Sequence, residues 1–451
     1  MPERLLHRAG RRVALAVSSV VIVTVLAACG AGSRASSRPV VTVFGNTTGQ
    51  DAAAFVASLD AFERSSGIDV RYVGSSDFET DLVERVRRGD LPDLALVPQP
   101  SLLRTLVGAG VVVALPDDLA ARARAEYDPR LVDLVTSGGH VQAAWYEVTL
   151  KSLIWYSPRE LARLGLAVPT TWDDLTVLAD AAMAAGIAPW CIGTRDGGSS
   201  GWAATDWIED LVLRFAGPDV YDGWVDHTIA FTDDRIVGAF DRFGAIALDA
   251  RQVAGGPRAA VEQTIEEAAN ALTASPPACL LHHQASFFPQ LLDGRPTFSP
   301  TGDVWMFPMP AAPGGGADPP PPLVVGATLL VAFDARPEVQ AVQRFLMSTD
   351  AAHARIADRS SFISPLRSVA PADYPSARDG AIAGWLAGAA TLRFDASDLM
   401  PPDVGLGAFW TGMTSYLGGA PLGIVLRDID DAWVAAQPRL PVVATSEVPS
   451  G

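Results

Sequence analysis

Cys29 is the residue of this chain whose surroundings most clearly point to covalent chemistry. It closes an apolar run that begins at Val13, and this run follows a segment with four arginines between residues 4 and 12. A basic segment, an apolar core and small residues before a cysteine form the layout of a secretory signal, with a core too short to span a bilayer. We therefore expect the chain to work outside the cytoplasm.

The residues Leu26-Ala27-Ala28-Cys29 resemble the lipobox of bacterial lipoproteins. In that family the signal is cleaved before the cysteine, which is diacylated and becomes the new N-terminus. The resemblance implies a signal peptide over 1–28, a lipid anchor at Cys29 and a flexible tether over 29–39. The alternative is an uncleaved N-terminal anchor helix in which the cysteine stands by chance.

The remaining cysteines, Cys191 and Cys279, are the only other thiols of the chain. Two thiols in an oxidising compartment tend to pair, so we expect a disulfide, with two buried free thiols as the alternative. No Cys/His spacing suits a structural zinc site, and the neighbours His282 and His283 would point apart on a strand or helix. We predict no metal and no cofactor.

The charge of the chain limits its partners. Residues 1–28 hold four Arg and one Glu, so their removal changes the formal net charge from −17 to −20. Binding to nucleic acid or to anionic lipid needs a positive surface, and we therefore expect no nucleic-acid partner. Lys151 is the only lysine beside 33 arginines, which resembles a codon bias.

The elements that position the polar residues alternate between strands and helices. We expect strands at 40–44, 68–72 and 94–97, with helices between them that end at Gly67 and Gly89. Such short connections indicate a parallel sheet, whose ligands gather at the carboxyl ends of the strands. These ends carry polar, uncharged residues at 46–48 and 99–101.

The second part of the chain is predicted to be mixed. Thr171 and Asp174 have the spacing of a capping box at the start of a helix. We expect strands at 150–156 and 324–333, and a surface loop at 310–322. The other expected helices cover 205–214, 234–249, 337–347 and 377–390. The chain carries no Walker loop and no H-E-x-x-H motif.

Several segments in order resemble the extracellular solute-binding proteins that serve ABC importers, and their sugar-binding branch in particular. They are Gly67-Ile68-Asp69-Val70, Gly89-Asp90-Leu91-Pro92-Asp93, Lys151-Ser152-Leu153-Ile154-Trp155-Tyr156 and Pro169-Thr170-Thr171-Trp172-Asp173-Asp174-Leu175. Two further segments resemble the α-glucoside-binding subgroup: Gly201-Trp202 with Thr205-Asp206-Trp207-Ile208-Glu209-Asp210, and Phe394-Asp395 with Ser397-Asp398-Leu399-Met400-Pro401.

The resemblance implies an α/β, two-lobe periplasmic-binding-protein-like fold of type II. In this fold each lobe is a mixed sheet flanked by helices, and the ligand binds in the cleft between the lobes. We place lobe one at 40–147 plus 283–335 and lobe two at 148–282 plus 336–440, followed by a C-terminal tail at 441–451.

Sugars are bound by planar polar side chains that reach hydroxyls and by aromatic faces that stack on the pyranose. Trp410 matches a stacking aromatic of the family, and Gly326-Ala327 match a stretch that approaches ligand by its backbone. Instead of binding ligand, these three residues could pack in the core. The alternative for Asp206 is a helix cap, and the alternative for Glu147 is a structural ion pair. The candidate ligand residues are Asn46, Thr48, Gln99, Ser101, Trp145, Tyr146, Glu147, Trp202, Asp206, Gln284, Phe287, Gly326, Ala327 and Trp410.

The function that this resemblance implies is that of a non-enzymatic, monomeric, lipid-anchored receptor on the extracytoplasmic face of the cell membrane. It would deliver a carbohydrate, an α-glucoside or short oligosaccharide, to the transmembrane subunits of an ABC permease with a cytoplasmic ATPase. A secreted glycosidase is the first alternative, although no pair of carboxylates is selected by the spacing. A sensor or adaptor with the same fold is the second. Many relatives carry an acid near Gly45-Asn46-Thr47-Thr48, and its absence here leaves the sugar open.

Overall fold

The computed structural model describes residues 38–313, 320–357 and 361–436. Residues 1–38 and 39–451 form separate units, and the fold below is that of the second. The predicted signal peptide, Cys29, most of the tether and the tail at 441–451 lie outside the described residues. In the part of the chain that is described, no helix is both long and apolar enough to cross a membrane.

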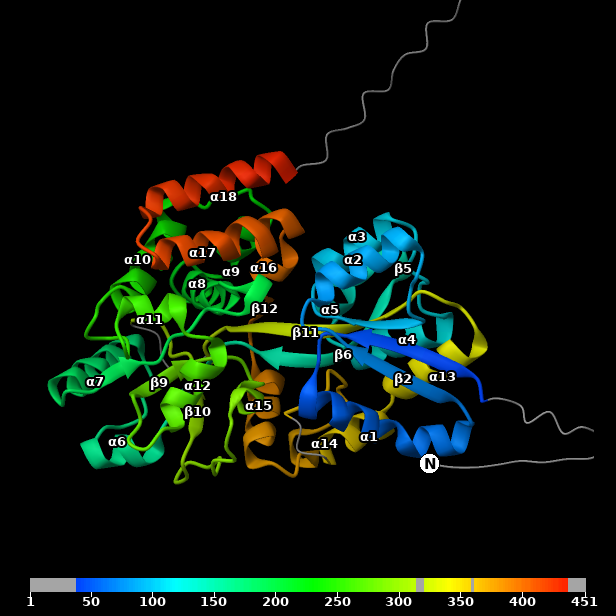
Figure 1. Ribbon diagram of the computed structural model, residues 1–451, viewed down its shortest axis with the longest axis horizontal. Coiled ribbons are helices and arrows are strands. Elements are labelled where there is room, and N and C mark those ends of the chain that lie inside the picture. Colours follow the sequence, from blue (N-terminus) through cyan, green and yellow to red (C-terminus); the bar gives the residue numbers. More distant parts are fainter. Residues whose placement is uncertain (1–37, 314–319, 358–360, 437–451) are drawn as a thin grey trace, which may run out of the picture. The chain divides into compact units, whose positions relative to one another are not determined.

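A six-stranded sheet forms one half of this unit (Figure 1). Its strands β1 (Val40–Gly45), β2 (Asp69–Gly74) and β3 (Leu94–Val97) are parallel, with β1 in the middle. Helices α1 (Gly49–Ser66) and α2 (Phe78–Arg88) connect them. Both helices end at glycines with positive φ, Gly67 and Gly89, because a left-handed C-cap suits a residue without a side chain. The predicted strand–helix order is confirmed here.

The same sheet continues through β11 (Leu323–Ala332), which pairs antiparallel with β3 and with β6 (Ala143–Leu150). The short strand β12 (Leu392–Phe394) pairs parallel with β11. In Figure 1, β6 and β11 run side by side across the middle of the unit. The prediction of one strand at 150–156 is wrong, because β6 ends at Leu150 and a separate strand begins at Leu153.

The second sheet has four strands in the order β10 (Trp305–Pro308), β7 (Leu153–Tyr156), β9 (Cys279–His283) and β8 (Ala188–Trp190). Strands β8 and β9 are parallel neighbours. Cys191 directly follows β8 and Cys279 begins β9, and the structure joins these two residues by a disulfide with Cα atoms 5.5 Å apart.

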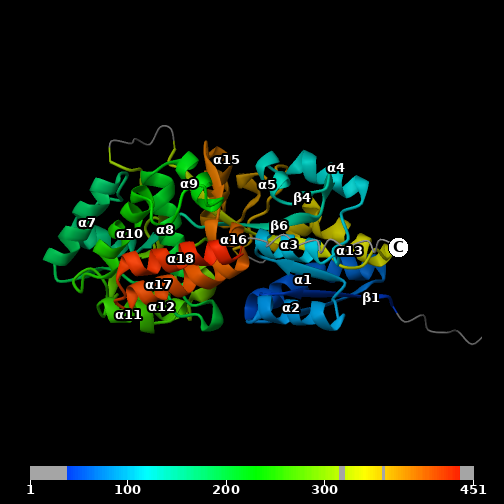
Figure 2. The same ribbon diagram turned by 90° about the horizontal axis from the view of Figure 1, so that it is seen from above.

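Helices cover both sheets. Helices α8, α10 and α17 gather around the second half of the unit, and α1, α2, α3 and α13 around the first (Figure 2). Helix α7 (Trp172–Ala184) begins with the capping box that the sequence predicts, since Thr171 and Asp174 each accept a hydrogen bond from the other's backbone N–H. The other helices are α3 (Pro100–Gly108), α4 (Asp117–Glu126), α5 (Pro129–Leu134), α6 (Pro158–Leu164), α8 (Trp202–Phe215), α9 (Pro218–Val225), α10 (Asp234–Ala247), α11 (Pro257–Glu262), α12 (Ile265–Thr273), α13 (Pro337–Leu346), α14 (Thr349–Ala357), α15 (Ala377–Gly388), α16 (Ala396–Leu399), α17 (Trp410–Leu417) and α18 (Leu422–Ala436), with a π-helical segment at Asp403–Phe409.

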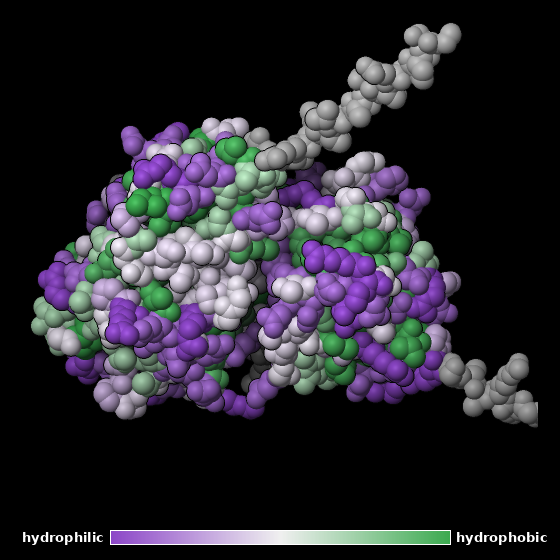
Figure 3. Space-filling model, turned by 45° about the horizontal axis from the view of Figure 1, so that its top comes forward, coloured by the Kyte–Doolittle hydropathy of each residue, from purple (hydrophilic) through white to green (hydrophobic). Residues whose placement is uncertain are grey.

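The buried apolar side chains form two clusters, one mainly around each sheet. A crevice separates the two halves on the face shown in Figure 3. The predicted lobe boundaries stay a prediction. Strand β10, which that prediction assigns to lobe one, pairs in the second sheet, and β12, assigned to lobe two, pairs in the first.

Candidate ligand-binding site

A polar stripe lies along one face of the β6–β11 ribbon. Glu147, Thr149 and Lys151 follow each other at every second position, so they share one face. The register places Thr328 opposite Glu147 and Gly326 opposite Thr149. Glu147 and Lys151 are four positions apart in the sequence, which corresponds to about 13 Å along an extended strand. The stripe leads from the first sheet to the segment where the chain passes into the second.

Gly326 makes room for the lysine stem at the end of this stripe. A Cβ atom at position 326 would lie 3.0 Å from Cε of Lys151. Gly326 is therefore the residue over which the lysine side chain passes. The family resemblance predicts a backbone contact of Gly326 with the ligand, and in the structure Gly326 lies against the side chain of Lys151. Its neighbour Ala327 is buried.

Glu147 belongs to a charged group below the start of α1. It lines a cavity of about 10 Å³ together with Asp51 and Arg355, a volume near that of one water molecule. Arg355 donates to Asp51 at 3.0 Å between Nη2 and Oδ1. Burial and the repulsion of Asp51 raise the pKa of Glu147 to about 8, against the attraction of Arg355. The rest of the cavity wall is formed by Thr47, Phe55, Tyr72, Leu96, Tyr146 and Thr328.

Lys151 is the centre of a second charged group. Its Nζ lies 3.0 Å from Oδ1 of Asp206 and 2.6 Å from Oδ2 of Asp395. The side chains of Asp206 and Asp395 are 3 % and 1 % exposed, so the pairs are shielded from water. Burial alone would lower the pKa of Lys151, but the carboxylates of Asp206 and Asp395 together raise it well above its usual value. The lysine is therefore held in its charged form.

Two carboxylates of this group are fixed by the start of α16. Glu209 accepts from the backbone N–H groups of Ala396 and Ser397, at 3.0 and 3.2 Å. Asp395 caps the helix by accepting from the N–H of Asp398 at 2.9 Å. Burial, followed by repulsion from Asp395, raises the pKa of Glu209 well above its usual value. These carboxylate oxygens stabilise the start of helix α16.

Asp206 is different because one of its oxygens has no partner. Its Oδ1 accepts from Lys151, whereas its Oδ2 is buried and accepts no hydrogen bond among the described residues. Burial raises the pKa of Asp206 to about 7, with Lys151 opposing this shift and Asp395 adding to it. An unsatisfied buried acceptor is unfavourable unless a ligand or water fills it.

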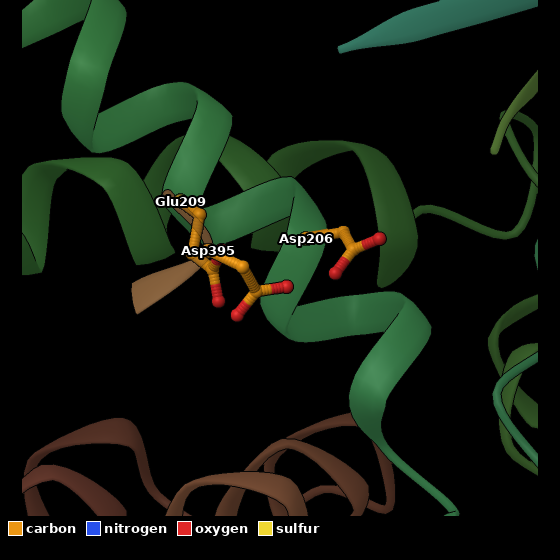
Figure 4. Close-up of side chains that lie close together, drawn as sticks. All are labelled: Asp206, Glu209 and Asp395. Carbon is orange, nitrogen blue, oxygen red and sulfur yellow. The ribbon is translucent and has the colours of Figure 1, made fainter. Parts of the chain in front are cut away.

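The oxygens of Asp206, Glu209 and Asp395 lie within 4.8 Å of one another (Figure 4). Asp206 and Glu209 project from α8, and Asp395 follows β12. Such a set of carboxylates suits a hard cation such as Ca²⁺. Here the ammonium of Lys151 contacts two of the three, so the neutralising cation is part of the chain itself.

Aromatic rings adjoin the lysine. Lys151 Nζ lies 5.2 Å from the ring centroid of Trp202, whose ring centroid is 5.9 Å from that of Phe287. Trp202 and Asp206 are one helical turn apart on α8 and share a face. The indole N–H of Trp202 donates to Asp196 at 2.7 Å. The site therefore combines an aromatic surface with an acceptor oxygen.

Gly201 allows a second tryptophan to approach. Its φ is +108°, and a Cβ there would lie 2.1 Å from the carbonyl oxygen of Trp410. The backbone of Trp410 thus packs directly on the start of α8. The Trp410 side chain is 9 % exposed, and its indole N–H has no partner among the described residues.

Other predicted site residues lie apart from this group or serve the fold. Trp145 is buried and donates its indole N–H to the carbonyl of Leu131. Gln284 is buried, and its side chain accepts from the N–H of Ala285. Tyr146 is buried between Phe55 and Phe362. Asn46 and Thr48 are exposed before α1.

Gln99 and Ser101 are buried at the start of α3. Gln99 donates to Glu79 at 2.8 Å. The charge of Glu79 adds to the shift that raises the pKa of Asp398, for which burial and then Asp395 are the larger causes. Arg104 of α3 donates to the carbonyl of Leu399 in α16. Residues of the first half therefore interact with α16 through the charge of Glu79 and the hydrogen bond of Arg104.

Sequence reasoning missed several residues of the two charged groups. The single lysine could have pointed to this site, because the other 33 Lys or Arg positions of the chain all carry arginine. Asp395, followed by Ser397 and Asp398, also has the spacing of a helix cap. The sequence did not predict the following residues of the two charged groups, the polar stripe and their polar neighbours: Asp51, Glu79, Thr149, Lys151, Glu209, Thr328, Arg355, Asp395 and Asp398.

Comparison with known proteins gives consistent results. The model of the family described as bacterial extracellular solute-binding protein matches residues 46–352. The chain is 35 % identical over 397 residues to the osmoprotective compounds-binding protein GgtB of Synechocystis sp., covering 88 % of this chain and 93 % of the relative. It is 36 % identical over 408 residues to the alpha-glucosides-binding periplasmic protein AglE of Rhizobium meliloti, covering 87 % and 86 %.

Solved structures show the same fold. The bacterial solute receptor AcbH, described as having an exclusive substrate preference for β-D-galactopyranose, matches with a TM-score of 0.75 at 17 % identity, covering 88 % of this chain and 98 % of that one. Maltose-bound MalE3 of T. maritima matches with a TM-score of 0.69 at 18 % identity, covering 88 % and 99 %. At these identities the likeness concerns the fold alone.

Proposed function

The chain belongs to the bacterial extracellular solute-binding protein family, and from this premise we propose that it captures a carbohydrate for import. The ligand is an α-glucoside or a short oligosaccharide. The receptor delivers it to the transmembrane subunits of an ABC permease that is driven by a cytoplasmic ATPase. The printed names of AglE and of the sugar-binding structures support this ligand class.

The observation that carries the proposal is that Lys151 joins an acceptor to an aromatic ring: it holds Asp206, whose Oδ2 has no hydrogen-bond partner among the described residues, and its Nζ lies 5.2 Å from the ring centroid of Trp202. A pyranose offers hydroxyl donors at its rim and C–H groups on its face. A buried carboxylate oxygen can accept a hydrogen bond from a sugar hydroxyl, and an aromatic ring can pack on the C–H face of the pyranose. Asp206 and Trp202 share one face of α8, so one sugar ring can meet both.

The stripe on β6 supports a ligand that is longer than one ring. Glu147, Thr149 and Lys151 carry polar groups along about 13 Å of strand. Glu79 of α2 and Gln99, which precedes α3, add a hydrogen-bonded pair of polar groups to the first half. A short oligosaccharide would place successive rings along this stripe.

The chemistry of the acids favours binding over hydrolysis. A glycosidase uses two carboxyl groups on either side of the scissile bond, one of them as an acid. Here Glu209 is held by two backbone N–H groups and Asp395 by Lys151 and a helix cap. Neither carboxyl group is free to act across a bond. We therefore propose a receptor without turnover.

The remaining part of the proposal concerns location. Membership of this family supports an extracytoplasmic location. We propose that Cys29 anchors it by lipid to the extracytoplasmic face of the membrane, and that it acts as a monomer. A sensor or adaptor role would use the same site and is distinguished by whether uptake fails when the gene is deleted.

A thermal-shift screen tests the ligand class. Neutral α-glucosides, galactosides, short oligosaccharides and free glucose are each added to the mature protein. A ligand at about 100 times its Kd stabilises the native state by about 2.7 kcal/mol, so the midpoint rises. Isothermal titration then gives Kd, and chromatography of the ligand after a day checks for cleavage. A panel without any response, or the release of sugar fragments, contradicts the proposal.

A further inference from the structure

Lys151 is the only lysine of the chain. The other 33 of its 34 Lys and Arg positions carry arginine. Arginine has a planar fork that binds one carboxylate at two points, whereas lysine has a compact ammonium whose donors point in different directions. The one ammonium among the Lys and Arg side chains of this chain is therefore at position 151.

The surroundings of Lys151 explain why a compact charge is needed there. Its two partners come from different elements, Asp206 from α8 and Asp395 from the segment after β12. Its stem passes over Gly326, so closely that a Cβ atom there would lie 3.0 Å from Cε of Lys151 and crowd the stem. A guanidinium is wider than an ammonium, and a fork would engage one of these carboxylates at the expense of the other.

The lysine also stands where the chain passes between the two sheets. Lys151 and Ser152 form the link from β6 in the first sheet to β7 in the second. Asp395 lies in the connection from β12 of the first sheet to helix α16. The hydroxyl of Ser152 accepts from the backbone N–H of Val324 at the start of β11. Residues 151 and 152 thus join the segments that connect the two halves.

We propose that Lys151 is the positioning residue of the ligand site. Its ammonium holds Oδ1 of Asp206, so that Oδ2 faces the ligand hydroxyl. Through Asp395 it connects the occupied site with the segment between β12 and α16. This inference rests on the proposed function, because it assumes that Asp206 contacts the ligand.

A double-mutant cycle tests whether Lys151 acts through Asp206. Lys151→Met removes the charge and keeps most of the stem, and Asp206→Asn weakens the acceptor. Each single variant should weaken sugar binding roughly 10- to 150-fold, as loss of a charged hydrogen bond does. The double variant should bind no more weakly than the weaker single variant. Lys151→Arg should not restore the affinity. Arg344→Met, which removes an exposed ion pair with Asp118, is the control and should bind normally.

A measurement on the unmodified protein covers the case in which a variant fails to fold. Because the chain has one lysine, labelling with ¹³Cε,¹⁵Nζ-lysine gives a single side-chain signal. This signal should move on sugar addition and saturate with the Kd found by calorimetry. An unchanged signal in sugar-saturated protein overturns the inference, as do single-variant effects that multiply in the double variant. Protein that binds no sugar at all overturns the proposed function, and with it the inference.

Discussion

Glu147 and Lys151 lie on the same face of one strand segment, and each is the centre of a separate buried charged group. Glu147 adjoins Asp51 and Arg355 in the first half of the unit. Lys151 contacts Asp206 of α8 and Asp395 of the segment between β12 and α16. Strand β6 and the residue that follows it therefore carry the central polar residues of both groups along a single line.

Replacement of Trp202 should separate a ligand contact from a core residue. Trp202→Ala removes the aromatic face beside Lys151, and sugar affinity should fall roughly 5- to 150-fold. Trp145→Ala is the comparison, because Trp145 is fully packed. It should cost about 3–5 kcal/mol of folding free energy. Titration calorimetry and urea unfolding on both variants check this. Normal binding by Trp202→Ala would remove this ring from the site.

Sugar affinity should rise with pH around neutrality. The pKa of Asp206 is raised to about 7, chiefly by burial, so the side chain gains its negative charge as the pH passes that value. The charged form is the stronger hydrogen-bond acceptor. Calorimetric titrations from pH 5.5 to 8.5 should show tighter binding at the alkaline end, and Asp206→Asn should flatten the profile. A flat profile in the unmodified protein contradicts a direct contact by this carboxylate.

The contribution of Glu147 to the stability of the ligand-free protein should fall between pH 5 and pH 8. Glu147 has a folded-state pKa of about 8, above its value in the unfolded chain. In this range the folded state binds more protons than the unfolded state, so stability decreases as pH rises and levels off above the folded pKa. Glu147→Gln should reduce this slope, measured by urea unfolding at each pH. Glu262→Gln, at an exposed position, should leave it unchanged.

The sequence predicted the elements that follow local rules. The strands of the first sheet and the ends of α1 and α2 come from short periodic patterns closed by Gly67 and Gly89. The capping box of α7 was readable because Thr171 and Asp174 are three residues apart. The fold class was predicted from the family resemblance, and the solved structures confirm it.

The site was only partly predictable, because its partners lie far apart in the sequence. Lys151 meets Asp206 at a separation of 55 residues, and only folding brings them together. Strand β6 was missed because its first residues form a continuous buried run without alternation. Trp145, which the sequence predicts as a ligand contact, lies within this run and is buried in the core.

Removal of the disulfide should destabilise the protein without changing its site. Cys191 and Cys279 are 88 residues apart in the sequence. Cross-linking such a loop restricts the unfolded chain by about 4–5 kcal/mol on the chain-entropy model. The Cys191→Ser/Cys279→Ser variant should therefore unfold at lower urea concentration but bind sugar with similar affinity. A thiol count on denatured, unreduced protein from its own host should find none in this pair, and two free thiols would contradict the prediction.

Cys29 should carry the lipid in the mature protein. The basic, apolar and Leu-Ala-Ala-Cys order motivates this expectation. Mass spectrometry of the membrane fraction should find a diacylglyceryl cysteine as the first residue. The Cys29→Ala protein should leave the membrane or retain its uncleaved signal, which N-terminal sequencing distinguishes. Membrane-bound Cys29→Ala protein that has lost its signal would contradict the lipid anchor.

Gly326→Ala is the smallest change that should disturb Lys151. The added methyl group would lie 3.0 Å from the lysine Cε, which must then shift by a few tenths of an ångström. Because the stem is flexible, folding should be little affected, whereas the ammonium should lose part of its contact with Asp206. Sugar affinity should fall by roughly 3- to 10-fold, a fraction of the charged hydrogen bond. The matched control is Gly384→Ala in helix α15, where an added Cβ meets nothing within 4 Å. It should bind normally and be slightly more stable, since alanine favours a helix. Equal affinities for Gly326→Ala, Gly384→Ala and the unmodified protein would show that the position of Lys151 does not govern binding.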